Sequence, residues 1–464
     1  MPPSNNPTNI GGVFPQLAVK AEHRPARTET GIGALMPWAD RLWFVTYVAH
    51  KAGSGAGTGL FYVDDDLTLT KHPEGRVGTY ANRIIHAESD QLIIGPHAID
   101  TEGNVRTFED LVDVRLTATA RHLENPAQKV YFLGMEGEFF EADVETLQVR
   151  QIHDLVEELG LRGRRTTHFK AAYTDHGRVV VANNSYYPED FDRGQSDGRL
   201  AEWQGGAWRT LAHTQFNTVT GRCGGNLGRA IYAVGQDRAS TLLYVYLPAT
   251  GWKLHRLPKS THTQDHAWTT EWPRIREVES ERFLMDAGGM FYELPAMTYA
   301  DAVWGVVPVC RHLRIIGDFC SWNGMLVMAG DQTTPISDSN PFAGQPQANL
   351  WLGKTDDLWH FGGQPSGWGG PWWETPVRAD EPSAPYLMTG FDRKCLHISV
   401  EDAEQVAFTV ELDFQGTGRN WHPCTRLVTG GGYARHVFED GLSAHWARVV
   451  PHGDCTATAQ FFYT

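Results

Sequence analysis

The chain has 464 residues, of which 41% are hydrophobic and 20% are charged, and it contains 48 Gly and 16 Trp. This composition is typical of a folded chain with a sizeable core and excludes an intrinsically disordered one. The formal net charge of −15 disfavours a nucleic-acid partner, because contacts to phosphates need clustered Lys and Arg.

The start of the chain, MPPSNNPTNIGGVFPQ, carries neither the basic nor the apolar region of a secretory signal. No apolar run reaches the roughly 18 residues of a membrane helix. We therefore expect no membrane partner and a cytoplasmic location, or secretion if a signal precedes this sequence. The six Cys are widely spaced, without a C-x-x-C pair, which predicts buried thiols and not a disulfide framework.

A short signature recurs seven times along the chain: a polar turn, then four or five apolar residues, then Gly or a polar cluster. The copies are DRLWFVTYV, DQLIIG, QKVYFLG, GRVVVANN, RAIYAVG, ERFLMDAGG and NGMLVMAG. Their first apolar residues are Leu42, Leu92, Val130, Val179, Ile231, Phe283 and Met325, at intervals of 50, 38, 49, 52, 52 and 42 positions. Intervals of this size are typical of propeller blades.

Each copy is followed by a second strand pattern, such as GLFYVDDD after the first and TLLYVYLPATG after the fifth. An apolar alternation precedes several copies, and a further stretch such as WKLHRL can supply an edge strand. The sequence therefore predicts an all-β chain whose residues 25–378 form a seven-bladed β-propeller with four strands per blade. Residues 153–161, HDLVEELGL, are the one convincing helical pattern.

The pattern changes near the end of the chain. From about Tyr386 the segments CLHISV, VAFTVELDF, GYARHVF, SAHWARVV and TATAQFFYT alternate with a period of two between Gly, Asp and Pro turns. This predicts a small β-sandwich-like cap over residues 379–464. Alternatively, some of these strands complete the last blade.

In a four-stranded blade, the loop after the second strand and the loop entering the innermost strand lie on the same face. If the seven signatures are second strands, every blade places polar residues there. Those after the second strands are His50, His97, Glu136, Asn183, Asn184, Asp237, Arg238, Asp286, Asp331 and Gln332. Those entering the innermost strands are Asn82, Arg83, Arg115, His168, Lys170, Arg222, His266, Trp268, His312 and Arg314.

The second set is conspicuously basic. Several cations in a protein of net negative charge favour an anionic ligand, because Arg presents a planar fork that matches a carboxylate. The alternative is that these cations pair with neighbouring carboxylates in a structural network. The loop around Asn183, Asn184 and Tyr186 offers hydrogen bonds for a sugar and a phenolic proton donor.

Other motifs are weak. The sequence has no Walker loop, no dinucleotide-binding fingerprint and no G-x-S-x-G elbow. The segment HTQDH, from His262 to His266, lacks the helical spacing of a zinc motif. The sequence leaves open whether the channel holds a structural or catalytic divalent cation, Ca²⁺ or Zn²⁺, because Asp and Glu at the channel mouth are adequate oxygen donors.

With its seven repeats, His50 in VTYVAH, a second His in the next blade (His86 or His97) and a basic channel mouth, the chain resembles the propeller carbohydrate-active enzymes. These are the L-rhamnose-α-1,4-D-glucuronate lyases and the ulvan lyases. The resemblance covers the architecture of residues 25–378. It implies cleavage of an acidic, uronate-containing oligosaccharide by β-elimination, in an exo-acting mode.

Such an elimination needs a cation at the uronate carboxylate, a base for the C5 proton and an acid at the leaving oxygen. The expected carboxylate-binding residues are Arg83, Arg115 and Arg238. The expected base is His50 or His97, and the expected acid is His168, His266 or Tyr186. Further substrate contacts are expected from Glu136, Lys170, Asn183, Asn184, Trp268, Asp286, Arg314 and Asp331.

Two other functions stay open from the sequence. A glycoside hydrolase on the same scaffold would use Glu136 with Asp286 or Asp331 as its carboxyl pair. A non-catalytic propeller that binds a glycan or a protein would need no such pair, because a fold alone does not imply catalysis. The oligomeric state is not indicated by the sequence.

Overall fold

The computed structural model describes residues 12–20, 30–48, 57–163, 167–185, 197–221, 230–261, 273–279, 282–295, 298, 301–335, 344–401 and 405–464. Strands dominate these ranges, in which α-helix is confined to α1 (Leu155–Glu158) and α3 (Leu358–Phe361). Four short 3-10 helices cover Pro15–Leu17, Ala87–Ser89, Glu109–Leu111 and Thr355–Asp357. The chain is therefore all-β, as predicted. Neither described helix has the length and apolar character needed to span a lipid bilayer.

The chain divides into two compact units. Unit 1 comprises Met1–Thr119, Ala142–Val149 and Arg314–Phe361, and unit 2 comprises Ala120–Glu141, Arg150–Leu313 and Gly362–Thr464. This division differs from the predicted boundary at residues 378 and 379.

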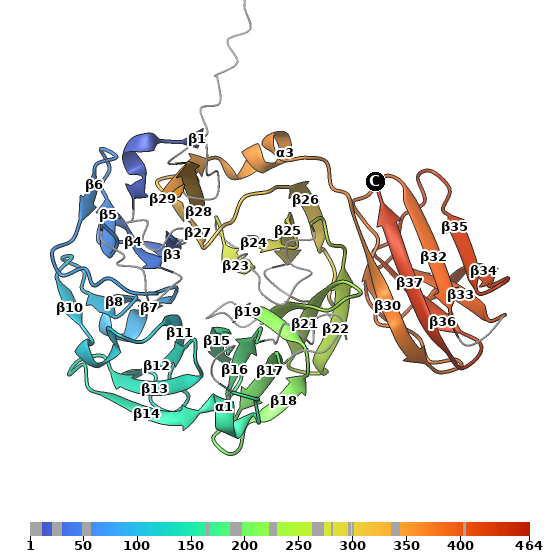
Figure 1. Cartoon of the computed structure of the whole chain (residues 1–464), viewed down its shortest axis with the longest axis horizontal. Helices are drawn as coiled ribbons and strands as arrows, with labels where there is room; N and C mark the ends of the chain where they lie inside the picture. Colours follow the sequence, from blue (N-terminus) through green and yellow to red (C-terminus); the bar gives the residue numbers. More distant parts are fainter. Residues whose placement is uncertain are drawn as a thin grey trace, which may run out of the picture. The chain divides into compact units, whose positions relative to one another are not determined.

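Three sheets belong to unit 1, and their strands lie side by side in Figure 1. The first sheet contains β3 (Thr30–Trp38), β4 (Arg41–Val48), β5 (Leu60–Val63) and β6 (Leu69–Lys71). The second contains β7 (Arg83–His86), β8 (Gln91–Ile94), β9 (His97–Ile99) and β10 (Val105–Thr107). The third contains β27 (Phe319–Trp322), β28 (Met325–Pro335), β29 (Gly344–Gly353), β1 (Gly12–Val13) and β2 (Val19–Lys20).

A fourth sheet is formed by β11 (Leu116–Arg121), β12 (Lys129–Gly134), β13 (Glu138–Asp143) and β14 (Val149–Asp154). Three further groups of strands lie in unit 2. They are β15 (Phe169–Asp175), β16 (Arg178–Asn183), β17 (Arg199–Trp203) and β18 (Arg209–Ala212); β19 (Gln215–Gly221), β20 (Ile231–Gln236), β21 (Thr241–Leu247) and β22 (Gly251–Leu257); and β23 (Arg274–Glu277), β24 (Arg282–Ala287), β25 (Met290–Pro295) and β26 (Val307–Arg311).

The seven predicted second strands are all strands of the structure. They are β4, β8, β12, β16, β20, β24 and β28, and each pairs with the strand that directly precedes it in the chain, an edge strand that we call the first strand of that sheet. Their apolar residues are almost fully buried, as in β8, where Leu92, Ile93 and Ile94 have no exposed surface. Burial on both faces explains why these strands read as continuous apolar runs.

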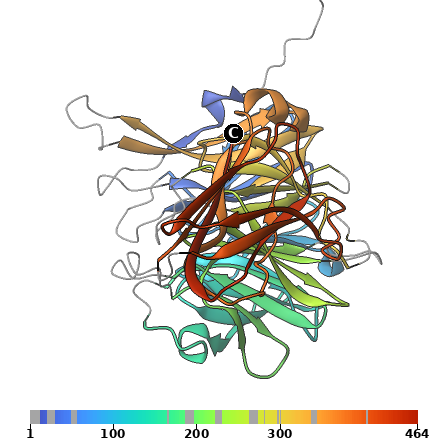
Figure 2. The ribbon, with the colours of Figure 1, turned by 90° about the vertical axis from the view of Figure 1, so that its right-hand side faces the viewer.

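The C-terminal strands also form where predicted. One sheet contains β30 (Gly367–Val377), β37 (Cys455–Tyr463), β32 (Lys394–Val400) and β35 (Tyr433–Val437). The other strands, β31 (Tyr386–Leu387), β36 (Trp446–Pro451), β33 (Ala407–Asp413) and β34 (His422–Val428), extend the sheet of β19–β22 through a parallel pairing of β22 with β31. These strands are coloured orange and red in Figure 2. One apolar core in unit 2 joins them to β20–β25.

The predicted helix is shorter than its sequence pattern. Helix α1 begins after Asp154, whose side chain accepts a hydrogen bond from the Val156 amide at 3.1 Å, and it ends at Glu158. His153, which the helical pattern included, belongs to strand β14. A helix of one turn is stabilised by its cap and by the burial of Leu155 and Val156, and not by its own length.

The described cysteines correct part of the thiol prediction. None of the five forms a disulfide, and Cys310, Cys320 and Cys455 are buried. Cys424 is exposed and Cys395 is half-buried, because both stand at positions of β34 and β32 that alternate away from the core.

Strands near the N-terminus complete the sheet of β27–β29. Strands β1 and β2 pair antiparallel with β29, so the predicted domain start at residue 25 leaves out two strands of this sheet. Between them, Leu17 is fully buried in a core with Leu350 and Leu352 of β29. The N-terminal segment therefore holds an edge of the sheet by apolar burial as well as by backbone hydrogen bonds.

Replacing Leu17 by Ala should lower the free energy of unfolding by about 2–4 kcal/mol, because the lost side chain leaves a cavity against β29. Chemical denaturation measures this change. The matched control is Val13→Ala in β1, where the side chain is 42% exposed, and its effect should stay within about 0.5 kcal/mol. Equal effects of the two substitutions would contradict the role of Leu17.

Candidate functional site

Several predicted site residues lie outside the described residues, or their side chains do. His50, Tyr186, His266 and Trp268 lie outside, as does Arg222. Asp331 lies in strand β28, paired with Ala348, and only its backbone is described. The remaining predicted residues can be placed in unit 1, in unit 2 or in the sheet of β11–β14.

In unit 1, Arg83 binds a carboxylate of the protein itself. It begins β7, and its Nε lies 2.6 Å from Oδ2 of Asp318, the residue that precedes β27. The Asp318 side chain is fully buried, and its Oδ2 also accepts a hydrogen bond from the Leu35 amide in β3 at 3.0 Å. One carboxylate therefore joins the first strands of three sheets.

This contact decides the charge of Arg83. Burial alone would lower the pKa of its guanidinium, but the Asp318 carboxylate more than offsets that effect and raises the pKa. Arg83 stays cationic with its charge neutralised inside the protein. Its contacts agree with the alternative that the basic residues pair in a structural network.

Arg314 is held differently in the same unit. Its Nη2 donates a hydrogen bond to Oδ1 of Asn349 in β29, and burial lowers the pKa of its guanidinium. The guanidinium lies over Gly330, where a Cβ would come within 2.1 Å of Arg314 Nη2. Gly at position 330 therefore provides the space for this side chain.

His97 starts β9, the third strand of its sheet. Its Nδ1 lies 3.0 Å from Thr107 Oγ1, and its Nε2 accepts a hydrogen bond from the Arg76 amide at 3.5 Å. Burial, followed by the charge of Arg76, lowers the pKa of His97 to about 3. The imidazole is therefore neutral at physiological pH, and both of its nitrogens have partners in the protein.

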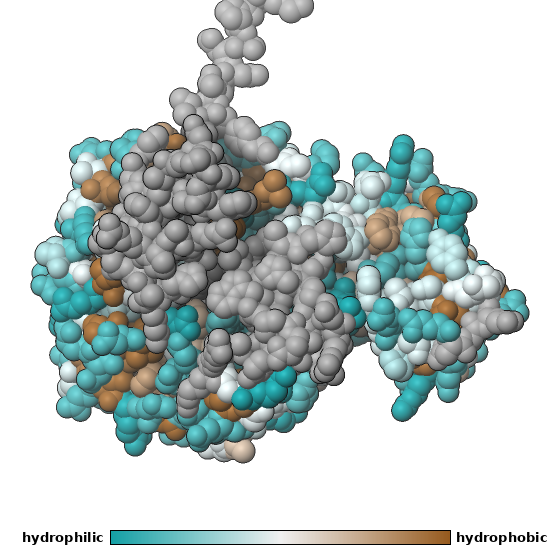
Figure 3. All heavy atoms as spheres, in the orientation of Figure 1, coloured by the Kyte–Doolittle hydropathy of each residue, from teal (hydrophilic) through white to brown (hydrophobic). Residues whose placement is uncertain are grey.

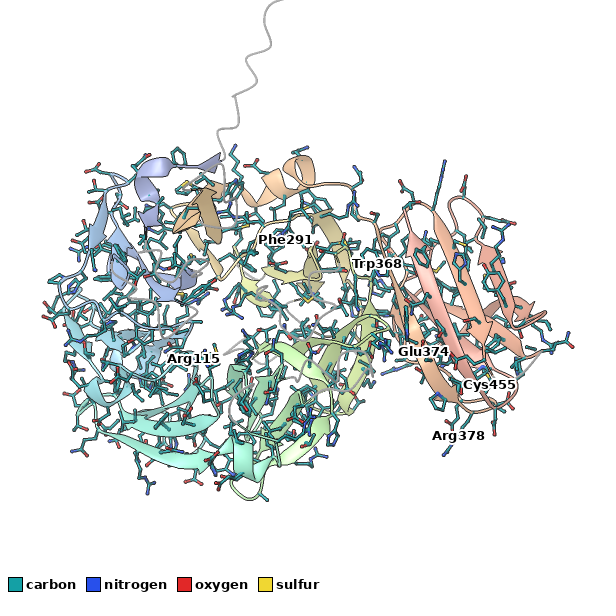
Figure 4. All side chains as sticks on the ribbon, viewed as in Figure 1. Arg115, Phe291, Trp368, Glu374, Arg378 and Cys455 are labelled. Carbon is teal, nitrogen blue, oxygen red and sulfur yellow. The ribbon has the colours of Figure 1, made fainter. Side chains whose placement is uncertain are left out.

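Arg115 and Glu136 occupy loop positions. Arg115, labelled in Figure 4, directly precedes β11 and is half-buried. Glu136 is half-buried in the turn between β12 and β13, where the Gly137 amide donates to the Gly134 carbonyl at 3.1 Å.

In unit 2, two hydrogen bonds join the end of β16 to the start of β15. The Asn184 amide donates to the His168 carbonyl at 2.9 Å, and the His168 amide donates to Ser185 Oγ at 2.9 Å. Two local bonds flank them: the Ser185 amide donates to Asn183 Oδ1 at 2.5 Å, and Thr167 Oγ1 donates to the Gly163 carbonyl at 2.6 Å. These contacts hold the backbone of the two strand ends together.

A β-bulge lies at the same end of two neighbouring first strands. In β15 the pairing with β16 shifts between Phe169 and Ala171, which makes Lys170 the additional residue. In β19 the pairing with β20 shifts between Phe216 and Thr218, which makes Asn217 the additional residue. A bulge redirects the side chain of the additional residue, and bulges are common beside binding sites.

Three asparagines near these bulges carry buried polar atoms without hydrogen-bond partners. Asn183 and Asn184 have no exposed surface, and Asn217 is 2% exposed. The atoms concerned are Asn183 Nδ2, Asn184 Nδ2, Asn184 Oδ1, Asn217 Nδ2 and Asn217 Oδ1. Each such atom costs about 1–3 kcal/mol of stability. We call these three residues, with His168 and Lys170, the asparagine site.

Asp286 and His312 form a second polar pair in unit 2. His312 Nε2 lies 2.9 Å from Asp286 Oδ1, and the His312 ring packs on Phe291, which is labelled in Figure 4. Burial and the nearby Asp286 raise the pKa of the Cys310 thiol to about 12. The side-chain partner of Asp286 in this pair is therefore a histidine and not a second carboxylate.

Arg238 contacts the C-terminal strands of unit 2. Its Nη1 lies 3.5 Å from Glu374 Oε2, and its guanidinium lies 5.9 Å from the ring centre of Trp373. Both residues belong to β30, and Figure 4 labels Glu374. The neighbouring Asp237 is bound by both terminal nitrogens of Arg256, at 3.0 and 2.8 Å.

Two entries to first strands were wrongly placed from the sequence. Strand β19 runs from Gln215 to Gly221, so it begins before the predicted entry at Arg222, a residue outside the described ranges. His312 follows β26, the fourth strand, whereas the residue that enters β27 is Asp318. First strands such as QFNTVTG carry few apolar residues, so their starts are weakly marked in the sequence.

The sequence reasoning missed Asp318, Asn217 and Asn349. For Asp318, a signal was present: an acidic residue stands directly before the apolar segment FCSW. Among the described residues, no three His, Cys, Asp or Glu side chains are grouped closely enough to hold a metal ion.

Replacing Arg83 by Met should lower the free energy of unfolding by about 3–5 kcal/mol, because Asp318 then stays buried without its cation. Chemical denaturation measures the loss. The double variant Arg83→Met/Asp318→Leu removes both charges and should regain part of the stability. An additive loss in the double variant would show that the two side chains are not coupled.

His97 should make the stability depend on pH. Its pKa of about 3 lies below the unfolded value, so the unfolded chain binds more protons between pH of about 3 and 6.5. Protonation of His97 in the unfolded chain therefore lowers the free energy of unfolding by about 1.4 kcal/mol per pH unit as the pH falls from about 6.5 to about 3. Above about pH 6.5 the full stability is present. His97→Gln should remove this slope when denaturation is compared at several pH values. An unchanged slope would contradict the assignment.

No family model matches the chain, and no curated protein matches it. Among solved structures, the chain is similar to the β-propeller domain of Cps50 (Swd1) from Myceliophteria thermophila, with 9% sequence identity and a TM-score of 0.38, over 69% of this chain and 96% of that one.

Proposed function

We propose that the seven sheets that contain the repeated second strands are the blades of a seven-bladed β-propeller, with the C-terminal strands as an appended β-domain. The regular spacing of these strands and their second place in each sheet support this architecture. The N-terminal strands on β29 agree with it, because pairing the start of the propeller segment with its last sheet would close the ring.

We further propose that the protein binds an acidic oligosaccharide at the asparagine site. The five unpartnered amide atoms of Asn183, Asn184 and Asn217 carry this proposal. Side-chain amides donate and accept hydrogen bonds at once, which suits sugar hydroxyls. The backbone around Asn183 and Asn184 is satisfied by Ser185 and His168, so the unpartnered amide atoms keep their hydrogen-bonding capacity for a ligand that reaches them.

The proposed reaction is a β-elimination at a uronate. Lys170 neutralises the carboxylate, which acidifies the C5 proton. His168 accepts that proton, the C4–C5 double bond forms as the C4–O bond breaks, and the leaving oxygen takes up a proton from water, after which His168 releases its proton to the solvent. His168 takes the place of His97 as the base in this proposal, because it belongs to the asparagine site together with Lys170, and its backbone contacts Asn184 and Ser185.

An elimination is preferred to hydrolysis for one structural reason. A hydrolase would need a pair of carboxyl groups facing one substrate bond, and Asp286, one predicted member of such a pair, is bound to His312 at 2.9 Å. The asparagine site instead combines a histidine, a lysine and neutral amides, which is the set that an elimination uses.

The first experiment incubates the protein with uronate-containing oligosaccharides and follows near-ultraviolet absorbance and reducing ends in parallel. Rising absorbance supports the elimination, because an unsaturated uronate forms. Reducing ends without absorbance would replace it with hydrolysis. Binding by calorimetry without conversion would leave a non-catalytic glycan-binding propeller, and neither binding nor conversion would refute the proposed ligand.

Replacing His168 by Ala should lower kcat/KM by about 100-fold or more. His176→Asn is the control, since His176 adjoins the opposite end of β15 with a φ of 50° that Asn tolerates. Full activity in His168→Ala would exclude this residue as the base.

Asn184→Leu should weaken oligosaccharide binding by about tenfold, the equivalent of one lost hydrogen bond to the sugar. The same variant should keep or raise the melting temperature, because its amide atoms have no partner in the protein. Isothermal calorimetry and thermal unfolding measure the two effects. A large loss of stability would show that Asn184 serves the fold.

A further inference from the structure

Three side chains on the outward face of the β30–β37–β32–β35 sheet form a chain of hydrogen bonds. Cys395 and His397 stand on β32, and Tyr433 starts β35. Cys395 Sγ lies 3.4 Å from His397 Nε2, and His397 Nδ1 lies 2.8 Å from the Tyr433 hydroxyl. In Figure 3 the surface over the C-terminal strands is mainly teal and white with isolated brown patches.

The alternation of β32 explains why these side chains meet. Along β32, Lys394, Leu396, Ile398 and Val400 are buried, whereas Cys395 and His397 are half-buried on the other face. Residues two apart on a strand share one face. Ser399 pairs with Tyr433 across the ladder, so the long tyrosine side chain can reach His397 diagonally.

The two contacts of His397 suit one tautomer of its imidazole ring. If Nε2 accepts the thiol proton, Nδ1 carries the hydrogen and donates it to the Tyr433 oxygen. A nucleophile, a base within reach of it and a third group that orients the base are the recurring elements of activated thiols and hydroxyls. Tyr433 acts here through His397 and is a positioning residue.

The thiol needs such a base. Burial raises the pKa of Cys395, and the charge of Arg435 lowers it only in part. Without help, the thiol would be protonated at neutral pH and a poor nucleophile. Transfer of its proton to His397 would form the thiolate at the moment of attack.

Apolar side chains border the thiol. Phe462 and Val437 are the ladder partners of Cys395, and they are 48% and 63% exposed. The Phe462 ring also contacts the His397 ring edge-on at 5.3 Å. An approaching reagent with an apolar body therefore has a surface to pack on beside the sulfur.

We propose that Cys395 is a modification site that reacts with low-molecular-weight disulfides, with His397 as its base and Tyr433 as the residue that positions the base. The Cys395 sulfur attacks one sulfur of the reagent, a new S–S bond forms and the S–S bond of the reagent breaks. His397 takes the Cys395 proton and returns it to the departing thiolate. Cys395 is oxidised to a mixed disulfide, and the second reagent sulfur is reduced to a thiol. This site is independent of the proposed oligosaccharide function.

Cys424 in β34 provides an internal control. Cys424 is exposed, whereas Cys395 is half-buried. Burial and the nearby Glu439 raise the pKa of the Cys424 thiol as well. If access alone set the rate, Cys424 would react first. If the hydrogen-bonded chain sets it, Cys395 reacts first despite its lower exposure.

The experiment treats the full chain with 4,4′-dithiodipyridine and with glutathione disulfide, and identifies the modified cysteine by peptide mass spectrometry. Cys395 should react at least about tenfold faster than Cys424 at neutral pH, and Cys395→Ser should remove this fast phase. His397→Gln should slow Cys395 by about tenfold and leave Cys424 unchanged. Tyr433→Phe should give a smaller loss and shift the pH–rate profile, a change that a merely structural role would not cause.

The proposal is overturned if Cys395 reacts no faster than Cys424. It is also overturned if His397→Gln keeps the wild-type rate and pH profile at Cys395. Far-ultraviolet circular dichroism of each variant checks folding, and the unchanged Cys424 rate reports that the neighbouring strands stay intact.

Discussion

The arrangement of the first strands in unit 1 depends on the contacts of one carboxylate, that of Asp318. It is fully buried, and it is shared by the Arg83 guanidinium of β7 and the Leu35 amide of β3. A buried carboxylate without such partners would be strongly unfavourable. The backbones approach closely at the same point, because a Cβ at Gly317 would lie 2.0 Å from the Ile32 carbonyl oxygen. Glycine and a paired charge together allow this close approach.

The strands that the sequence predicted best are those with the simplest burial. The second strand of each sheet is covered on both faces, so its apolar run is continuous, as in Leu92 to Ile94. First strands carry polar residues and bulges, and their starts were harder to place. Lys170 and Asn217 illustrate this, because a one-residue bulge changes which side of the strand a residue faces.

Contacts between distant positions explain most of what the sequence could not predict. Arg83 and Asp318 are 235 positions apart, and neither residue alone indicates the other. The two-residue strands β1 and β2 lie among Gly and Pro, and they are ordered by β29 and not by their own propensity. Asn183 and Asn184 could be placed at the end of a strand from the sequence, because they follow the continuous apolar run of β16.

The hydrogen-bonding state of the predicted site residues bears on function. The charge of Arg83 and both nitrogens of His97 in unit 1 are satisfied by the protein itself. The side-chain amides of Asn184 and Asn217 in unit 2 are buried and have no partner at either atom. Folding alone would select against such groups, since apolar residues of the same size would cost less. Their retention is explained if they bind a polar ligand, and a sugar with several hydroxyls can satisfy both functions of each amide at once.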